Sequence, residues 1–215
     1  MSKVLICIAG IDGSGKTTVA KQLIKLHYSF KYIWARWEPF ILYPLIWFVN
    51  RNKGKESNIE KHYKSKKNKK QKLLRSNIVK GIWLFLGEID YLLQLIFKFY
   101  MPYLFNKKII CDRYIYDFYI DQAINLSVTS DVFTAFLKKR IFFYVFPKPT
   151  HVIYINVSSD VGFNRKQDGT SLEYLDERKL FYDKLSNIYN VTIIDGEKKI
   201  EDVVQEVSVI LSKYE

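Results

Sequence analysis

The sequence has few of the residues that build disulfide scaffolds or metal centres. Its 215 residues include two cysteines and three histidines. Cys7 and Cys111 each lie in an apolar, strand-like run, which is typical of small buried side chains in a reducing compartment. His27, His62 and His151 lack the spacing of metal ligands. We therefore assign neither residue type a role in chemistry.

Long apolar runs are also missing. Residues 40–49 are densely apolar and aromatic, but they are too short to span a bilayer and they contain Pro44. The chain passes from Met1 almost directly into an apolar run, without the charged region and cleavage site of a signal peptide. No linker rich in Ser and Pro and no internal repeat is visible. We expect a single cytoplasmic domain spanning residues 1–215.

The positive charge is concentrated in one segment. The net charge is +12, and residues 51–72 contribute +8 of it, with ten basic residues against two acidic ones. This lysine-rich insertion has no apolar periodicity, so its simplest interpretation is a solvated, mobile surface loop. A patch that binds an anionic substrate or an anionic membrane surface is the alternative. Because the charge is local, we expect no specific nucleic-acid partner.

Against this background, residues 10–18 carry a phosphate-binding motif. They read Gly-Ile-Asp-Gly-Ser-Gly-Lys-Thr-Thr, which matches the phosphate-loop pattern without a gap. The apolar run at 4–8 precedes the motif and a helical pattern at 19–24 follows it, so the motif lies on a strand-to-helix turn. The glycines let backbone N–H groups surround phosphate oxygens, Lys16 reaches the β- and γ-phosphates, and Thr17 binds Mg²⁺. The predicted ATP contacts in this loop are Gly10, Asp12, Gly13, Ser14, Gly15, Lys16, Thr17 and Thr18.

Five apolar runs separated by helical patterns predict an α/β fold with a parallel sheet. The runs span residues 4–8, 31–35, 107–111, 151–157 and 191–194. Ligands of open parallel sheets gather where the strands end. Arg36 and Glu38 follow the second run, and Asp112 and Arg113 follow the third, so we expect all four to contact the substrate. Asp112 is also a candidate Mg²⁺ ligand.

Residues 73–100 predict one long helix that is apolar almost all round. Such a helix lies centrally in a fold or in a dimer interface, and its charged residues argue against a membrane span. We therefore expect a homodimer. Together with the apolar segment at 40–49 and the lysine run, this helix leaves peripheral membrane contact as an alternative.

Several segments together resemble the thymidylate kinase family of P-loop kinases, in the family's order. They are the phosphate loop, Glu38-Pro39, Ile-Cys-Asp-Arg-Tyr at 110–114, Asp-Val-Gly-Phe-Asn-Arg at 160–165, and Asp195-Gly196. The resemblance spans most of the chain. It implies a P-loop kinase fold with a five-stranded parallel sheet, and transfer of the γ-phosphoryl group of ATP to dTMP.

The resemblance also implies roles for individual residues. Asp12 would contact the acceptor sugar, and a mobile lid at about 158–171 would cover the site. The phosphate loop has no arginine, so Arg165 in the lid is the candidate to bind ATP in the transition state, with Lys166 as its backup and Arg178 as the alternative arginine. The expected catalytic residues are Lys16, Arg113, Arg165 and Asp12.

The chain departs from the family pattern at the acceptor. Residues 87–91 lack the arginine expected for the acceptor phosphate, and residues 115–121 lack the Ser and Tyr-Gln of the thymine pocket. Asp117 instead lies near Arg113 and is expected to contact the acceptor, so we expect dTMP to bind weakly and Asp117→Asn to improve its binding. Two alternatives are a kinase that phosphorylates a non-nucleotide hydroxyl and a nucleotide-dependent regulatory protein without transfer activity.

Overall fold

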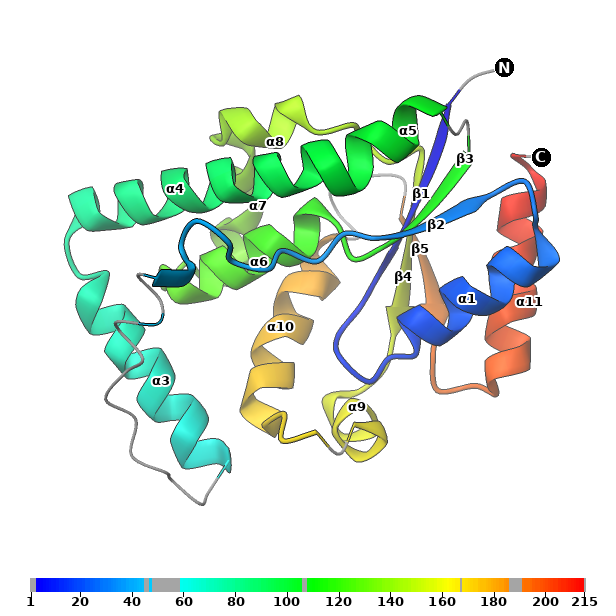
Figure 1. Cartoon of the computed structure of the whole chain (residues 1–215). Helices are drawn as coiled ribbons and strands as arrows, with labels where there is room; N and C mark the ends of the chain where they lie inside the picture. Colours follow the sequence, from blue (N-terminus) through cyan, green and yellow to red (C-terminus); the bar gives the residue numbers. More distant parts are fainter. Residues whose placement is uncertain are drawn as a thin grey trace.

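The architecture is a five-stranded, all-parallel sheet with helices on both faces (Figure 1). The computed structural model describes residues 3–44, 47, 59–105, 108–166, 168–185 and 191–214. The strands are β1 (Val4–Ala9), β2 (Lys31–Trp34), β3 (Lys108–Asp112), β4 (His151–Asn156) and β5 (Val191–Asp195). Their order in the sheet is β2-β3-β1-β4-β5. The predicted α/β fold with five parallel strands is confirmed.

The central position of β1 explains its sequence. All six of its residues are buried, and it pairs with β3 on one side and β4 on the other, with Ile6 opposite both Ile110 and His151. A strand covered on both faces has no solvent-facing positions, so it is continuously apolar rather than alternating. Cys7 lies opposite Cys111 on β3, and both thiols are buried and free, as the sequence predicted.

Each face of the sheet has its own apolar core. Ile6 and Ile8 pack with α1 (Lys16–Leu26) and α11 (Ile200–Ser212) on one face. Leu5 and Cys7 belong to the larger core on the other face, which is built from α4 (Asn77–Leu95), α6 (Ile115–Asn125) and α10 (Leu172–Leu185). Figure 1 shows the two groups of helices on opposite sides of the strands.

The remaining helices are short or lie at the periphery. They are α3 (Ile59–Leu73), η1 (Ile96–Tyr100), α5 (Met101–Phe105), η2 (Ser130–Val132), α7 (Phe133–Lys138), α8 (Ile141–Val145) and α9 (Ser159–Arg165).

The lysine-rich insertion is not a loop where it is described. Residues 59–72 form most of α3, and residues 51–58 lie outside the described part of the chain. Lysine is a good helix former, so this composition is compatible with a helix. Because α3 buries none of its residues, its sequence has no apolar periodicity that would have predicted it. Polar contacts hold it to α10: Tyr63 Oη donates to Glu177 Oε2 at 2.7 Å, and Glu60 Oε1 accepts from the Leu172 N–H at 2.7 Å.

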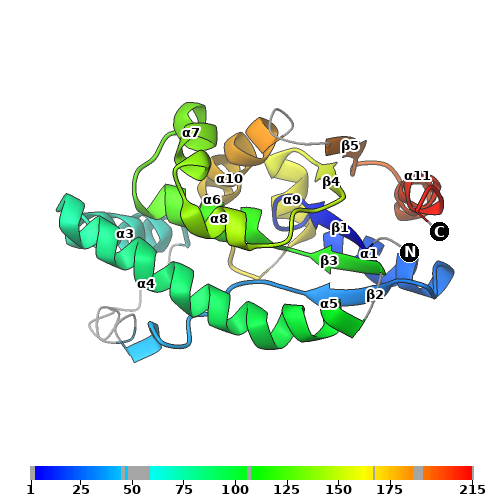
Figure 2. The same ribbon diagram turned by 90° about the horizontal axis from the view of Figure 1, so that it is seen from above.

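The long helix begins four residues later than predicted, because residues 74–76 turn the chain between α3 and α4. It then continues past Tyr100, through the π-helical turn η1 and into α5. Figure 2 shows α4 and α5 as one continuous rod beside β2. No described helix has the length and hydropathy needed to cross a membrane.

The predicted lid begins as a helix. Residues 159–165 form α9, which packs directly on the phosphate loop: a Cβ on Gly13 would overlap the carbonyl group of Gly162. Lys166 and residues 168–171 then lead into α10. The segment therefore covers the phosphate loop with helical backbone and reaches the neighbouring cavity with the residues that follow.

Candidate active site

The phosphate loop joins β1 to α1 in a conformation that needs its glycines. Gly13 and Gly15 have φ angles of 82° and 88°, in the left-handed region that glycine adopts without strain. Gly15 caps α1, and no side chain bonds to the first turn of this helix, so its N–H groups face the loop. Lys16 Nζ donates to the Ile11 carbonyl at 2.7 Å. Burial, followed by the charge of Arg113, lowers the pKa of Lys16 to about 8. A bound phosphate would favour the protonated amine.

Thr17 and Asp112 meet where the sequence placed a magnesium site. Thr17 Oγ1 donates to Asp112 Oδ2 at 2.5 Å, and Tyr32 Oη donates to the same oxygen at 3.1 Å. The other carboxylate oxygen, Asp112 Oδ1, is buried without a hydrogen-bond partner. An orphaned carboxylate oxygen beside a hydroxyl fits Mg²⁺, which takes one or two protein oxygens and completes its shell with phosphate oxygens and water.

Arg113 joins the phosphate loop to α6. It has a φ of 59°, which is uncommon for a residue other than glycine and turns the chain sharply after β3. Its guanidinium forms an ion pair with Asp12, and Nη1 donates to Asp117 Oδ1 at 3.2 Å. Asp117 also accepts a hydrogen bond from Tyr182 Oη at 2.6 Å and caps α6 through the Tyr114 N–H. One arginine therefore holds two carboxylates from different elements.

The charges of this network shift the pKa values of its acids in opposite directions. Burial would raise the pKa of Asp12, but the cations Arg113, Lys16 and Lys166 outweigh it and hold that pKa well below the usual range. For Asp117, burial dominates and raises the pKa, although Arg113 and Lys16 oppose it. The cations around Asp12 thus favour its ionised form, whereas burial favours the protonated form of Asp117.

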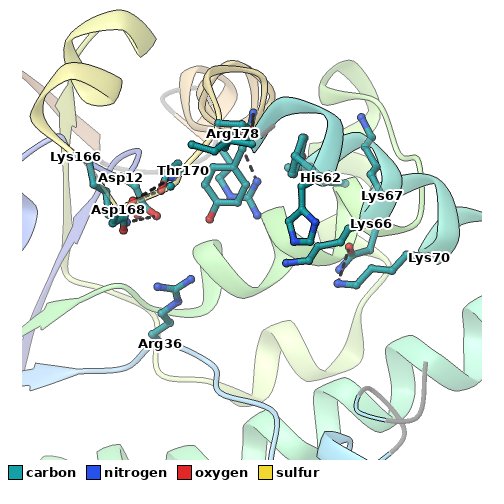
Figure 3. Close-up of a pocket in the computed structure, with 17 residues that line it drawn as sticks. Asp12, Arg36, His62, Lys66, Lys67, Lys70, Lys166, Asp168, Thr170 and Arg178 are labelled. Carbon is teal, nitrogen blue, oxygen red and sulfur yellow. Dashed lines mark hydrogen bonds and ion pairs between the residues drawn. The ribbon is translucent and has the colours of Figure 1, made fainter. Parts of the chain in front are cut away.

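A cavity of ≈470 Å³ opens beside Asp12 and extends to α3 (Figure 3). Six of its lining residues are lysine or arginine, and two are acidic. The basic residues are Arg36, Lys66, Lys67, Lys70, Lys166 and Arg178. The acidic residues, Asp12 and Asp168, both form ion pairs with Lys166, at 3.0 and 2.9 Å. The volume is that of a small-molecule site, and its lining favours an anion.

Arg36 and Arg178 line this cavity and a smaller one that reaches Arg113 and Asp117. Arg36 makes no hydrogen bond or ion pair with another described residue, and Figure 3 shows it extending into the space between the two walls. Arg178 forms an ion pair with Asp121, and its guanidinium lies 3.4 Å from the centroid of the Tyr174 ring. The expected substrate contacts Arg36, Asp117 and Arg113 are therefore brought together.

Two expected site residues are directed elsewhere. The Glu38 carboxylate forms an ion pair with Lys98 of η1 at 3.2 Å, and Gln94 bonds to both backbone groups of Glu38, so its side chain lies on the α4 side and lines neither cavity. Arg165 is exposed, and its Nη1 donates to the Gly196 carbonyl at 2.7 Å. As placed here, Glu38 does not contact the acceptor site and Arg165 does not reach it. Lys166 and Arg178 supply lid-side cations instead.

Asp117 also differs from expectation. Its charge is compensated by Arg113 and by the Tyr182 hydroxyl, so it does not stand as an unpaired charge against a phosphate. The structure argues that Asp117→Asn would loosen Arg113 rather than ease a repulsion.

Sequence reasoning missed the α3 wall. His62, Lys66 and Lys70 line the cavity and are spaced four apart, which places them on one helix face once the segment is known to be helical. That spacing was the available signal.

The comparisons with known proteins agree with this geometry at the level of the fold. No protein-family model and no curated protein matches the sequence. Deoxyadenosine kinase from M. mycoides with bound dATP is 16% identical over 97% of this chain and 99% of that chain, with a TM-score of 0.55. Its structure with the products dCMP and a flexible dCDP is 19% identical over 98% and 100% of the two chains, with a TM-score of 0.57. This chain has the P-loop nucleoside kinase fold.

In this chain the phosphate loop and the ends of β2 and β3 lie at one edge of the sheet, where parallel α/β folds bind their ligands. The likeness covers both chains almost completely, and at 16–19% identity it concerns the fold alone.

Proposed function

We propose that the chain is an ATP-dependent kinase of nucleoside monophosphates, with dTMP as the leading acceptor. The observation that carries this proposal is the basic cavity that continues from the phosphate loop. A neutral nucleoside needs no such lining, because cations around a neutral ligand lose hydration without gaining a charged partner from it. An acceptor that already carries a phosphate would use the lining.

The residues have complementary roles in this reaction. The phosphate loop and Lys16 hold the β- and γ-phosphates of ATP. Thr17 and Asp112 would hold Mg²⁺, which would offset the negative charge of the phosphates. Arg36 and Arg113 line the smaller cavity beside Asp12, where an acceptor phosphate would approach the γ-phosphorus. The ion pair between Arg113 and Asp12 keeps this arginine in place.

Release of ADP with a panel of acceptors tests the proposal. The panel contains dTMP, the other nucleoside monophosphates, thymidine, deoxyadenosine and simple sugars. We expect turnover with a monophosphate, and kcat/KM for the corresponding neutral nucleoside lower by at least about 100-fold. Turnover of a sugar alone would support the non-nucleotide acceptor, and ATP binding without any turnover would support a regulatory protein.

A deoxynucleoside kinase is the second candidate. The structural neighbours are deoxyadenosine kinases along their whole length, and one holds dCMP as a product. Efficient phosphorylation of deoxyadenosine or thymidine in the same panel, with monophosphates inert, would favour it over our proposal.

We also propose that α4, η1 and α5 form the interface of a homodimer. Large apolar side chains are exposed at helical spacing along this rod. They include Ile78, Ile82, Phe85, Leu93, Phe97, Met101 and Leu104. Phe97 is 75% exposed. Monomers rarely expose so many large apolar side chains along one helical rod, and a twofold axis would pair this surface with its own copy.

Light scattering on the wild type and on Phe97→Glu tests the interface. We expect a dimer that becomes a monomer on substitution. A wild type that is monomeric at micromolar concentration would contradict the proposal.

Binding of an anionic membrane by the lysine-rich segment has less support. Lys66, Lys67 and Lys70 line the cavity, and Lys64 and Lys67 form ion pairs with Glu173 and Glu177. The charge of α3 is therefore directed partly inward.

A further inference from the structure

The cations of the acceptor cavity form two groups at opposite ends. Figure 3 shows Lys166 beside Asp12 and Asp168 at the phosphate-loop end, and His62, Lys66 and Lys70 across the space on the α3 wall. Arg36 lies between the groups. The acidic lining residues are both at the phosphate-loop end, so the α3 end is the more positive of the two.

A single acceptor phosphate accounts for only one of these groups. The acceptor phosphate must lie next to the γ-phosphate, at the end marked by Asp12 and Arg113. A nucleotide bound this way extends its base across the cavity toward α3. The base of dTMP is neutral, and lysines that face a neutral group lose hydration without gaining a charged partner.

The α3 lysines of the cavity differ from others on the same helix. Lys66 and Lys70 line the cavity, and Lys70 Nζ donates to Asn125 Oδ1 on α6 at 3.4 Å. Lys66, Lys69 and Lys72 are all exposed, but Lys69 and Lys72 line no part of the cavity. The helix thus presents one set of lysines to the cavity and another away from it, and solvation of a surface helix does not explain the set at the cavity.

We infer that His62, Lys66 and Lys70 form a second anion subsite, and that the preferred acceptor is a nucleoside monophosphate with a negatively charged group, a carboxylate or a phosphate, at its base end. This inference rests on the proposed function and narrows its substrate. In the reaction an oxygen of the acceptor 5′-phosphate bonds to the γ-phosphorus of ATP while the bond from that phosphorus to the β–γ bridging oxygen breaks. ADP leaves and the base-end anion is unchanged.

Three probes of nearly equal size test the subsite. They are dTMP, 5-hydroxymethyl-dUMP and 5-carboxy-dUMP, which carry a methyl, a neutral polar and an anionic group at the same position. We expect the wild type to turn over 5-carboxy-dUMP with a KM at least about ten-fold below those of the two neutral nucleotides, because charge-assisted bonds in a partly enclosed site exceed neutral ones. The preference should shrink as salt is raised.

Matched double variants locate the effect. Lys66→Gln with Lys70→Gln should remove the preference for 5-carboxy-dUMP, raising its KM more than that of dTMP. Lys69→Gln with Lys72→Gln removes the same charge from the solvent side and should keep the preference. Circular dichroism on both variants checks that α3 is retained.

The outcomes separate this inference from the proposed function. Turnover of all three probes with equal KM, or equal effects of the two double variants, overturns the anion subsite and leaves the monophosphate kinase standing. No ADP release with any monophosphate overturns the proposed function itself. Phosphorylation of an oligonucleotide 5′-hydroxyl in preference to all three probes would overturn both.

Discussion

The two ends of the acceptor cavity are built in different ways. At the phosphate-loop end, the positions come from buried backbone: β1 is fully buried, and Asp12, Lys16 and Asp112 are each less than 5% exposed. The α3 wall buries none of its own residues and is held by side-chain contacts to α10 and α6. Exposed ion pairs contribute less than about 1 kcal/mol each, so the wall is held far less firmly than the loop.

This difference predicts where substitutions act. Groups fixed by buried backbone hold the reacting phosphates and should govern kcat. Groups on a weakly docked helix contact the far part of the acceptor and should govern KM. Substitutions at the two ends of the cavity therefore test whether kcat and KM are governed separately.

The largest effect is expected for Lys16→Ala. It removes the charge that faces the β- and γ-phosphates, so kcat should fall by roughly 10³ or more. Steady-state ADP release measures it. Lys21→Ala is the control, because Lys21 is exposed on the same helix. Turnover by Lys16→Ala near the wild-type rate would show that the phosphate loop is not the donor site.

Arg178→Ala should be the next most damaging change. Arg178 lines both cavities and its removal leaves Asp121 unpaired there, so kcat/KM for the acceptor should fall by about 100-fold. Arg165→Ala should cost less than about ten-fold, because this exposed arginine bonds to the Gly196 carbonyl. A loss of 10³ or more in kcat for Arg165→Ala would mean that α9 turns this arginine inward during the reaction.

Asp117→Asn tests whether Asp117 holds the Arg113 guanidinium in place. The substitution weakens the pairing of a buried guanidinium while the Tyr182 hydrogen bond can persist, so unfolding free energy should fall by roughly 1–3 kcal/mol and kcat by about ten-fold. Denaturant unfolding and ADP release give the two numbers. Asp131→Asn is the control, since that carboxylate is 80% exposed and lines neither cavity. Improved turnover of dTMP by Asp117→Asn would instead support the expectation from the sequence that Asp117 repels the acceptor phosphate.

The same contrast explains what could be predicted from the sequence. The strands and the phosphate loop were predictable because burial imposes continuous apolar runs and the loop needs glycine at fixed positions. Helix α3 was not, because its contacts are polar and its partners are far away in the chain, as with Glu60 and Leu172, 112 positions apart. Lysine spacing alone does not distinguish a docked helix from a solvated loop.

Glu38 shows a second limit. The position of a residue after a parallel strand predicts the edge of the sheet that it reaches, but not the direction of its side chain. Here Gln94 binds the backbone of Glu38 and Lys98 binds its carboxylate, which turns it toward α4. Only the packing of the long helix against this segment decides that direction. For a related reason the sequence did not show that Arg165 on α9 donates to the Gly196 carbonyl, and its role in the transition state stays a prediction.

The smallest effect tests how α3 is docked. Glu177 on α10 accepts a hydrogen bond from Tyr63 Oη and forms an ion pair with Lys67, so it joins two residues of the cavity wall to the core of the fold. Glu177→Gln keeps the hydrogen-bond acceptor and removes the charge. Because the pair is only partly buried, the change should cost less than about 1 kcal/mol.

That loss should appear in binding rather than in chemistry. We expect Glu177→Gln to raise KM for the acceptor two- to five-fold and to leave kcat and the KM for ATP within about two-fold. Glu173→Gln, which removes the partner of the more exposed Lys64, is the matched control and should have a smaller effect. A fall in kcat with unchanged KM would show that the α3 wall positions the reacting groups, and the division between the two ends of the cavity would then be wrong.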